Sequence, residues 1–146
     1  MNAPVFVDTN VLLYRHDDAN PEKQEAAAAW LVHLWRTRSG RLSTQVLQEF
    51  YLNATQKLKP GLNPEMARRE VIDLAAWHPI SVDLRVIADA WDLQDRYQLS
   101  FWDCLIAAAA KLAGCRFLLT EDLQHDQDLN GVRVLNPFIA RPGSSP

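Results

Sequence analysis

The sequence predicts one α/β domain, arranged as a three-layer α/β/α fold around a mostly parallel sheet of about five strands. Short apolar runs alternate with longer stretches of helical spacing, which is the pattern of βαβ units. The 146 residues are 48% hydrophobic, enough for one domain with a substantial core. The longest uninterrupted apolar runs, Ala26–Val32 and Cys104–Ala110, have only seven residues each. A membrane span needs about 20, so none is expected.

Five short runs are predicted as strands because they are rich in β-branched and apolar residues, as in strands buried on both faces. They are Val5–Val7, Arg41–Ser43, Pro79–Val82, Arg116–Thr120 and Val132–Leu135.

Helix boundaries are marked by capping residues and by proline. Asn20 before Pro21 begins a helix that we expect to reach about Arg38 and to be closed by Gly40, because proline is favoured at the first helical position. Asn63 and Pro64 repeat this signal for a helix to about Trp77. The other helices are expected over Val11–Tyr14, from Ser43 or Thr44 to Lys59, from Asp83 to about Tyr97, and from Ser100 to Gly114.

The domain is predicted to occupy residues 1–139, and the Pro-, Gly- and Ser-rich residues 140–146 are predicted to be a flexible tail. Cys104 and Cys115 lack any zinc-binding spacing and are expected to be buried thiols. A net charge of -3 argues against binding of nucleic acid by overall positive charge.

Four acidic residues are predicted to meet at one edge of the sheet. Asp8 directly follows the first strand, and Asp122 comes two residues after the strand Arg116–Thr120. Glu49 lies near the start of the third helix, and Asp103 lies in the first turn of the helix that begins at Ser100. In doubly wound sheets the functional crevice lies beyond the carboxyl ends of the strands, where these acids would converge.

Each acid also has an ordinary structural explanation. Asp103 could complete a capping box with Ser100, and Glu121 with Asp122 could form a polar turn after a strand. Glu49 could be a solvated helix residue, although apolar residues surround it. Asp8 is the hardest to explain without a ligand, because a carboxylate at the end of a buried strand is costly to bury alone.

A divalent cation would hold such a cluster together. No Lys or Arg lies within five residues of Asp8, Glu49 or Asp103, and clustered carboxylates repel one another unless a cation neutralises them. Ligation by oxygen alone suits Mg²⁺ or Mn²⁺, which activate water and stabilise phosphoryl oxygens. The residues therefore predict a metal-dependent phosphodiester hydrolase or phosphotransferase.

The chain resembles the PIN-domain ribonucleases in five consecutive segments, and its length resembles the VapC-like toxins of type II toxin–antitoxin pairs. The opening motif is Val5–Tyr14 with Asp8, and the later segments follow in the family's order, each except the last with its acid. They are Ser43–Tyr51, Leu99–Ala109, Leu118–Leu123 and the closing strand Val132–Phe138.

The resemblance implies a single-strand endoribonuclease that uses Mg²⁺, with Mn²⁺ as a substitute, to activate water. Its acidic quartet would be Asp8, Glu49, Asp103 and Asp122, of which Asp8, Asp103 and Asp122 would ligate the metal. Thr9, Asn10 and Thr120 would orient these acids. The family pattern favours Asp122 over its neighbour Glu121, although the sequence leaves open whether Glu121 shares this position.

The resemblance also implies partners. They are an RNA substrate, a cognate antitoxin and a second copy of the chain, with DNA bound only through the antitoxin and no contact with a membrane. The expected location is the cytoplasm, because the N-terminus shows no signal peptide. Trp30, Leu31, Leu34 and Trp35 crowd one helix, which suggests an apolar interface for a homodimer.

Three alternatives remain at this stage. A haloacid-dehalogenase-like phosphatase also has an Asp after its first strand, but it needs a second Asp where this chain has Asn10. A response-regulator receiver needs a Lys after its last strand, and the last Lys here is Lys111, in a predicted helix. A PIN fold kept only for RNA binding would not need all four acids.

Overall fold

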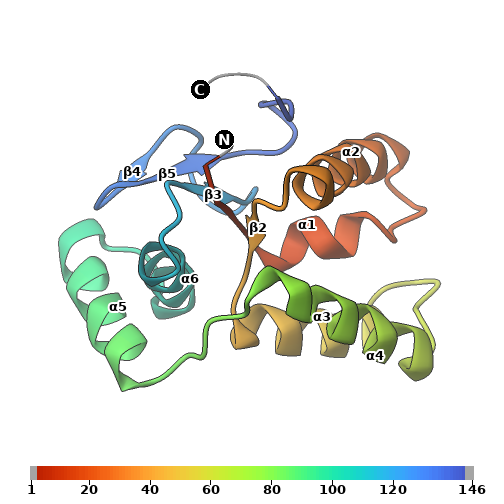
Figure 1. The fold of residues 1–146 in the computed structure, drawn as a ribbon, viewed down its shortest axis with the longest axis horizontal. Helices are drawn as coiled ribbons and strands as arrows, with labels where there is room; N and C mark the ends of the chain where they lie inside the picture. The colour runs from red at the N-terminus through yellow and green to blue at the C-terminus, as the bar shows by residue number, and fades with distance from the viewer. Residues whose placement is uncertain (1–2, 144–146) are drawn as a thin grey trace.

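The computed structural model describes residues 3–143 and has a five-stranded sheet of order β2-β1-β3-β5-β4. β1 (Val5–Val7) pairs in parallel with β2 (Gly40–Arg41) and with the central strand β3 (Phe117–Leu119). β3 pairs in parallel with β5 (Val132–Leu135), and β4 (Asp128–Leu129) pairs antiparallel with β5 at the edge. Helices flank the sheet (Figure 1), so the predicted α/β class with a mostly parallel sheet is confirmed.

One of the predicted strands is wrong. Pro79–Val82 contributes only an isolated bridge between Ile80 and Ser43, because Pro79 lacks an N–H and Asp83 already caps the next helix. The fifth strand is instead β4, which turns into β5 through Asn130 and Gly131, both with positive φ (54° and 97°). Asn-Gly is the preferred pair for such a tight hairpin turn.

The predicted helices are confirmed, with small changes at their ends. The end of α2 differs: Arg38, with φ of 56°, takes the left-handed position, whereas Gly40 belongs to β2. A Cβ on Gly40 would lie 2.6 Å from the Trp77 ring, so this glycine allows close packing instead of ending a helix. The helices are α1 (Thr9–Tyr14), α2 (Pro21–Thr37), α3 (Thr44–Gln56), α4 (Pro64–Asp73) with the 3-10 turn η1 (Leu74–Trp77), α5 (Leu84–Tyr97) and α6 (Phe101–Leu112).

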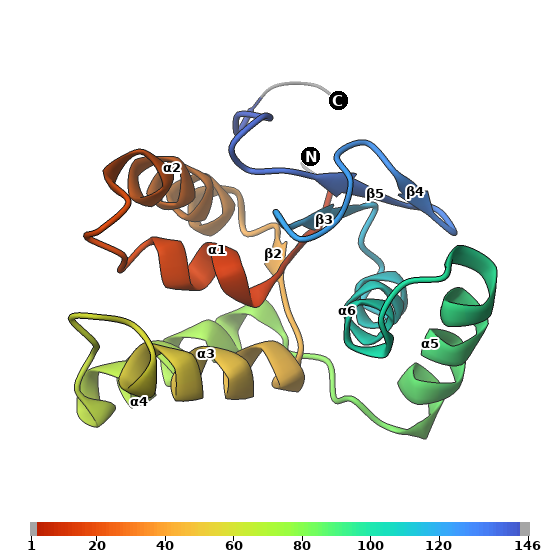
Figure 2. The same ribbon diagram turned by 180° about the vertical axis from the view of Figure 1, so that it is seen from behind.

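The helices form two groups that meet at the carboxyl edge of the sheet. Helices α1 to α4 lie on one side of the molecule and the α5–α6 pair lies on the other, as Figures 1 and 2 show from opposite directions. α1 packs against α3, and α6 packs against β3 and β5. Residues that follow β1 and β3 therefore point into the space between α1, α3 and α6.

The apolar cluster on α2 belongs mainly to the core. Trp30, Leu31 and Leu34 are buried, and only Trp35 is partly exposed, at 38%. The expectation that these four residues form an interface is therefore wrong, because three of them pack inside the domain. Trp30 also donates a hydrogen bond to the Ala140 carbonyl (3.0 Å).

Other expectations can be checked within residues 3–143. Cys104 and Cys115 are both buried and free, as predicted. No helix in this part of the chain has the length and apolar character to span a membrane. Of the predicted tail, residues 144–146 lie outside the described residues.

Candidate active site

Asp8 is held at the end of β1 with its carboxylate facing inward. Its backbone N–H donates to the Leu119 carbonyl (3.0 Å), which continues the pairing of β1 with β3. The carboxylate caps α1 by accepting from the Thr9 backbone N–H (2.7 Å), and it also accepts from the Thr120 hydroxyl (2.8 Å). Only 6% of Asp8 is exposed, so backbone and hydroxyl donors define its orientation.

Asn10 and Thr120 connect Asp8 to Asp122. The Asn10 amide Nδ2 donates to Thr120 Oγ1 and to Asp122 Oδ2, each at 3.1 Å, and approaches Asp8 Oδ2 at 3.4 Å. Thr120 Oγ1 also accepts from the Asp122 backbone N–H (3.1 Å). The acids that follow β1 and β3 are thus linked by one polar network.

Glu49 enters the same space from α3, which begins at the Ser43 cap. Its Oε1 accepts from the Thr9 hydroxyl at 2.7 Å. The Gln45 amide, one helical turn earlier, approaches its Oε2 at 3.4 Å. The Thr9 side chain on α1 therefore links the segment that carries Asp8 to Glu49 on α3 by a hydrogen bond.

Asp103 lies in the first turn of α6 and is not used as a reciprocal cap. The Ser100 hydroxyl accepts from the Asp103 backbone N–H (3.1 Å). The Asp103 carboxylate, however, makes no hydrogen bond or ion pair with the other residues between 3 and 143. The capping explanation thus accounts for the backbone of Asp103 and leaves its side chain available to a ligand.

All four acids line one cavity of about 240 Å³. No Lys, Arg or His is among the described residues that line it. Trp102 lies at its wall with 63% of its surface exposed. The complete lining is Asp8, Thr9, Asn10, Leu13, Gln45, Glu49, Asn53, Trp102, Asp103, Ile106 and Asp122.

The electrostatics of this cavity favour a bound cation. Burial raises the pKa of Asp8 from 3.8 to about 7, although the Thr120 and Thr9 hydrogen bonds act in the opposite direction. The charges of Asp122 and Glu49 raise it further. Burial also raises the pKa of Asp122; its hydrogen bond from Asn10 lowers it, and the charges of Asp103 and Glu121 add to the rise. A cation in this cavity would reverse these shifts, since opposite charge stabilises the ionised form.

The donor set fits a hard divalent ion such as Mg²⁺. Besides the carboxylates, two buried amide oxygens, Asn10 Oδ1 and Gln45 Oε1, have no hydrogen-bond partner. Buried polar atoms are normally paired, and oxygen ligands of this kind suit Mg²⁺ or Mn²⁺. Within residues 3–143 no three His, Cys, Asp or Glu side chains already form a compact metal site, so ligation requires the carboxylates to close in on the ion.

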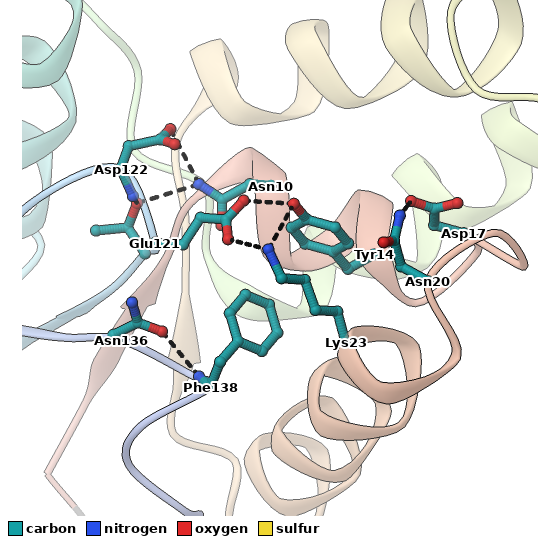
Figure 3. Close-up of polar contacts among 10 residues, drawn as sticks. Asn10, Tyr14, Asp17, Asn20, Lys23, Glu121, Asp122, Asn136 and Phe138 are labelled. Atoms are coloured by element: carbon teal, nitrogen blue, oxygen red, sulfur yellow. Dashed lines mark hydrogen bonds and ion pairs between the residues drawn. The ribbon is translucent and has the colours of Figure 1, made fainter.

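Glu121 is held away from this cavity by a separate group of contacts (Figure 3). Its carboxylate forms an ion pair with Lys23 of α2 (2.9 Å) and accepts a hydrogen bond from the Tyr14 hydroxyl. Lys23 also lies 5.0 Å from the ring centres of Tyr14 and Phe138. Glu121 thus already has a cationic partner, whereas Asp122 faces the acids.

A family model for the PIN domain matches residues 5–127. The chain belongs to the PIN-domain family. The match includes all four acids and ends before β5, which is consistent with the motif order in the sequence. No curated protein sequence showed significant similarity to this PIN domain.

Several solved structures share the fold at low sequence identity. FitAcB from Neisseria gonorrhoeae is 22% identical, with a TM-score of 0.66, covering 93% of this chain and 99% of that one. A toxin–antitoxin complex from Klebsiella pneumoniae gives 20% identity and a TM-score of 0.63, covering 91% and 97%. The sarcin–ricin loop cleaving toxin VapC20 of Mycobacterium tuberculosis gives 18% and 0.55, covering 78% and 86%.

Sequence reasoning missed several residues that the structure brings to the PIN-domain cavity. Gln45 and Asn53 line it, and both lie four residues from Glu49 on α3, so helical spacing could have identified them. The Lys23–Glu121 pair joins residues far apart in the chain, and no local pattern in the sequence could have predicted it.

Proposed function

We propose that this PIN domain is a Mg²⁺- or Mn²⁺-dependent endoribonuclease that cuts single-stranded RNA. The observation that carries the proposal is the cavity lined by Asp8, Glu49, Asp103 and Asp122 without a cationic side chain. Such a cavity repels a phosphodiester unless a divalent ion is present. The same ion can neutralise the carboxylates and activate water for cleavage of a phosphodiester.

Each residue has a defined part in this proposal. Asp8, Asp103 and Asp122 hold the metal, and Glu49 reaches it partly through water. A bound Mg²⁺ or Mn²⁺ supplies Lewis acidity and lowers the pKa of water for attack in line with the leaving oxygen. Thr9, Asn10 and Thr120 hold the carboxylates in place through the hydrogen bonds described above, because ligand orientation tunes a metal site.

The preference for single strands is supported by Trp102. Its ring lies at the cavity wall with most of its surface exposed, and Phe101 packs against it edge to face, 5.5 Å between ring centres. An exposed, supported aromatic ring can stack on an unpaired base. Bases inside an A-form duplex are stacked on one another and are not accessible in this way.

The alternatives lose support at the same cavity. A dehalogenase-like phosphatase needs an Asp at the position of Asn10 as its acid and base. The Asn10 amide donates hydrogen bonds to Asp8 and Asp122 and does not take that role. A receiver would need a Lys beside its acids, and no Lys is among the described residues that line the cavity.

The products of RNA cleavage test this proposal. We expect 5′-phosphate and 3′-hydroxyl ends, because water is the nucleophile, and complete loss of cleavage in EDTA with recovery on addition of Mn²⁺. End-group analysis of a cleaved RNA oligonucleotide measures this directly. A 2′,3′-cyclic phosphate, or full activity in EDTA, would contradict the metal mechanism.

A second test distinguishes the two acids that follow β3. Asp122→Asn is expected to lower kcat/KM by about 10²-fold or more, because it removes a proposed metal ligand. Glu121→Gln is expected to stay within about five-fold, since Gln can still accept from Tyr14 and Lys23. The same order should appear in Mn²⁺ affinity by calorimetry.

The charge-reversed pair Lys23→Glu with Glu121→Lys is the matched control for this comparison. Because it restores an ion pair in the same place, it should recover activity that either single reversal loses. Failure of the double variant to recover, together with loss of Mn²⁺ affinity in Glu121→Gln, would make Glu121 the fourth acid instead.

The biological setting we propose is that of a cytoplasmic VapC-like toxin that binds a cognate antitoxin and contacts DNA only through it. Structures with this fold include toxin–antitoxin complexes, and several of these, such as VapBC from Salmonella typhimurium, are bound to DNA. We also propose a homodimer. Exposed apolar residues such as Leu84 and Trp91 on α5, at 80% and 55% exposed, are better candidates for its interface than the buried α2 cluster.

A further inference from the structure

A polar row on α3 leads out of the acidic cavity. Gln45, Glu49, Asn53 and Lys57 follow one another at intervals of four residues along α3 and its C-terminal cap. Residues at this spacing form one ridge of a helix. Gln45, Glu49 and Asn53 line the acidic cavity, and Lys57 lies one turn beyond them, so the row continues past the catalytic acids.

A second cavity of about 320 Å³, here called the flanking cavity, lies beside this row. It shares Asn10, Leu13 and Asn53 with the acidic cavity, so the two spaces adjoin between α1 and α3. Its other described lining residues are Tyr14, Asp17, Lys57 and Leu58. The volume is at the lower end of the range of small-ligand pockets, about 300–1,000 Å³.

The walls of the flanking cavity are largely apolar, with two polar groups that are free to bind. Leu13, Leu58 and Tyr14 provide the apolar surface. The Asn53 side chain makes no hydrogen bond, and Lys57 makes no ion pair, with any other residue between 3 and 143. Lys57 is the one cationic side chain among the described residues that line either cavity.

The Tyr14 wall is held rigidly from behind. Its hydroxyl is bound to Glu121 and lies near Lys23 (3.4 Å). Its ring packs edge to face on Phe138, with 5.2 Å between ring centres. Figure 3 shows these contacts together on one side of Tyr14. A wall fixed in this way costs little entropy when a flat ligand binds to it.

We propose that the flanking cavity seats one unpaired base of the RNA, next to the nucleotide whose phosphate enters the acidic cavity. The Asn53 amide, which can both donate and accept, hydrogen-bonds the edge of that base. Lys57 contacts the adjoining backbone phosphate. This inference rests on the proposed ribonuclease function and adds a determinant of RNA sequence preference to it.

The chemistry of the site favours a nucleotide over other ligands. A largely apolar space lined by the Tyr14 ring and the Asn53 amide matches the way in which proteins read unpaired bases, by stacking and by hydrogen bonds to the base edge. Lys57 is the one cationic side chain among the described residues of the two cavities, and Asp17 also lines the flanking cavity. One positive charge among acidic residues suits a single phosphate better than a polyanion. Continuity with the acidic cavity places this base directly beside the bond that is cut.

Binding of RNA tests the proposal independently of cleavage. The inactive Asp8→Asn protein serves as the background, and fluorescence anisotropy measures its affinity for a labelled single-stranded oligonucleotide at several salt concentrations. Adding Lys57→Gln should weaken binding about five-fold at low salt and reduce the slope of log K against log salt by roughly 0.7, as for one lost phosphate contact. Lys59→Gln, an exposed neighbour outside both cavities, is the matched control and should change neither.

Cleavage assays test the reading of the base. In the otherwise unchanged protein, Asn53→Ala should raise KM more than it lowers kcat and should relax the preference for one base beside the cleavage site. Asn53→Gln, which keeps the amide, should restore part of that preference. Cleavage maps of a randomised oligonucleotide measure both effects.

The outcomes separate this proposal from the proposed function. If the wild-type protein cleaves RNA with a metal but Lys57→Gln and Asn53→Ala match the Lys59→Gln control, the flanking cavity is not an RNA site. If RNA binding depends on Lys57 and Asn53 but no cleavage occurs, the flanking cavity stands and the hydrolytic function fails. Absence of both RNA binding by Asp8→Asn and RNA cleavage by the wild-type protein with Mn²⁺ overturns both.

Discussion

Replacing Asp8 by Asn is expected to lower RNA cleavage by at least about 10³-fold while the fold remains intact. Stabilisation by a metal ion is worth several kcal/mol in the transition state, and each 1.36 kcal/mol corresponds to a factor of about ten in rate. Asp8 makes the most buried contacts of the four acids, so its loss should remove most of this stabilisation. Mn²⁺ affinity measured by calorimetry should fall in parallel.

Asp103→Asn provides an independent test of the same site. The Asp103 carboxylate has no partner among the described residues, and the Ser100 cap of α6 uses only the Asp103 backbone N–H. The substitution should therefore not weaken α6. We expect the same loss of cleavage, with an unchanged circular dichroism spectrum. Asp92→Asn, on the exposed side of α5, is the control. Retention of full Mn²⁺ affinity in Asp8→Asn would contradict the site as proposed.

The sequence was sufficient to predict which acids meet, because topology decides this. Strands β1 and β3 are adjacent and parallel, so residues just after them, Asp8 and Asp122, must lie at the same edge. Helix signals at Ser43 and Ser100 then placed Glu49 in the second turn of α3 and Asp103 in the first turn of α6, near the ends of helices that start at that edge. These signals are local, and they are strong enough to be read from the chain.

The sequence was less informative where tertiary contacts decide the outcome. Pro79–Val82 has strand composition but only one bridge to Ser43, because it lies at an edge and is cut short by the next helix. The role of Glu121 depends on Lys23, which is 98 residues away in the chain. The flanking cavity depends on how α1 packs on α3, and composition alone does not predict that packing.

The buried Asp8 carboxylate should also make the stability of the domain depend on pH when metal is removed. Burial raises the pKa of Asp8 to about 7 in the folded protein, whereas an exposed Asp, as in the unfolded chain, has a pKa of 3.8. Between these values the folded state binds more protons than the unfolded state, so stability falls as pH rises. The full favourable contribution is present below about pH 4 and is lost above pH 7.

The expected size of this effect is about 4 kcal/mol, from roughly three pKa units at 1.36 kcal/mol each. Urea unfolding in EDTA at pH 5 and at pH 8 samples about two of these three units, a difference of about 2.7 kcal/mol. Relative to Asp8→Asn, which carries no ionisable group there, the wild-type protein should lose stability between the two pH values. Asp92→Asn should follow the wild-type curve. Parallel curves for wild type and Asp8→Asn would show that burial does not raise the pKa of Asp8.

Added Mn²⁺ should offset this dependence of stability on pH. An ion bound by Asp8, Asp103 and Asp122 competes with the proton on Asp8, so its affinity rises as pH passes 7. Binding to the folded state alone raises stability, by about 2.7 kcal/mol when the free ion is at 100 times its Kd. The stabilisation by Mn²⁺ should therefore be largest at pH 8, where the metal-free protein is least stable, and nearly absent at pH 5. Equal stabilisation at both pH values would mean that the ion binds without Asp8.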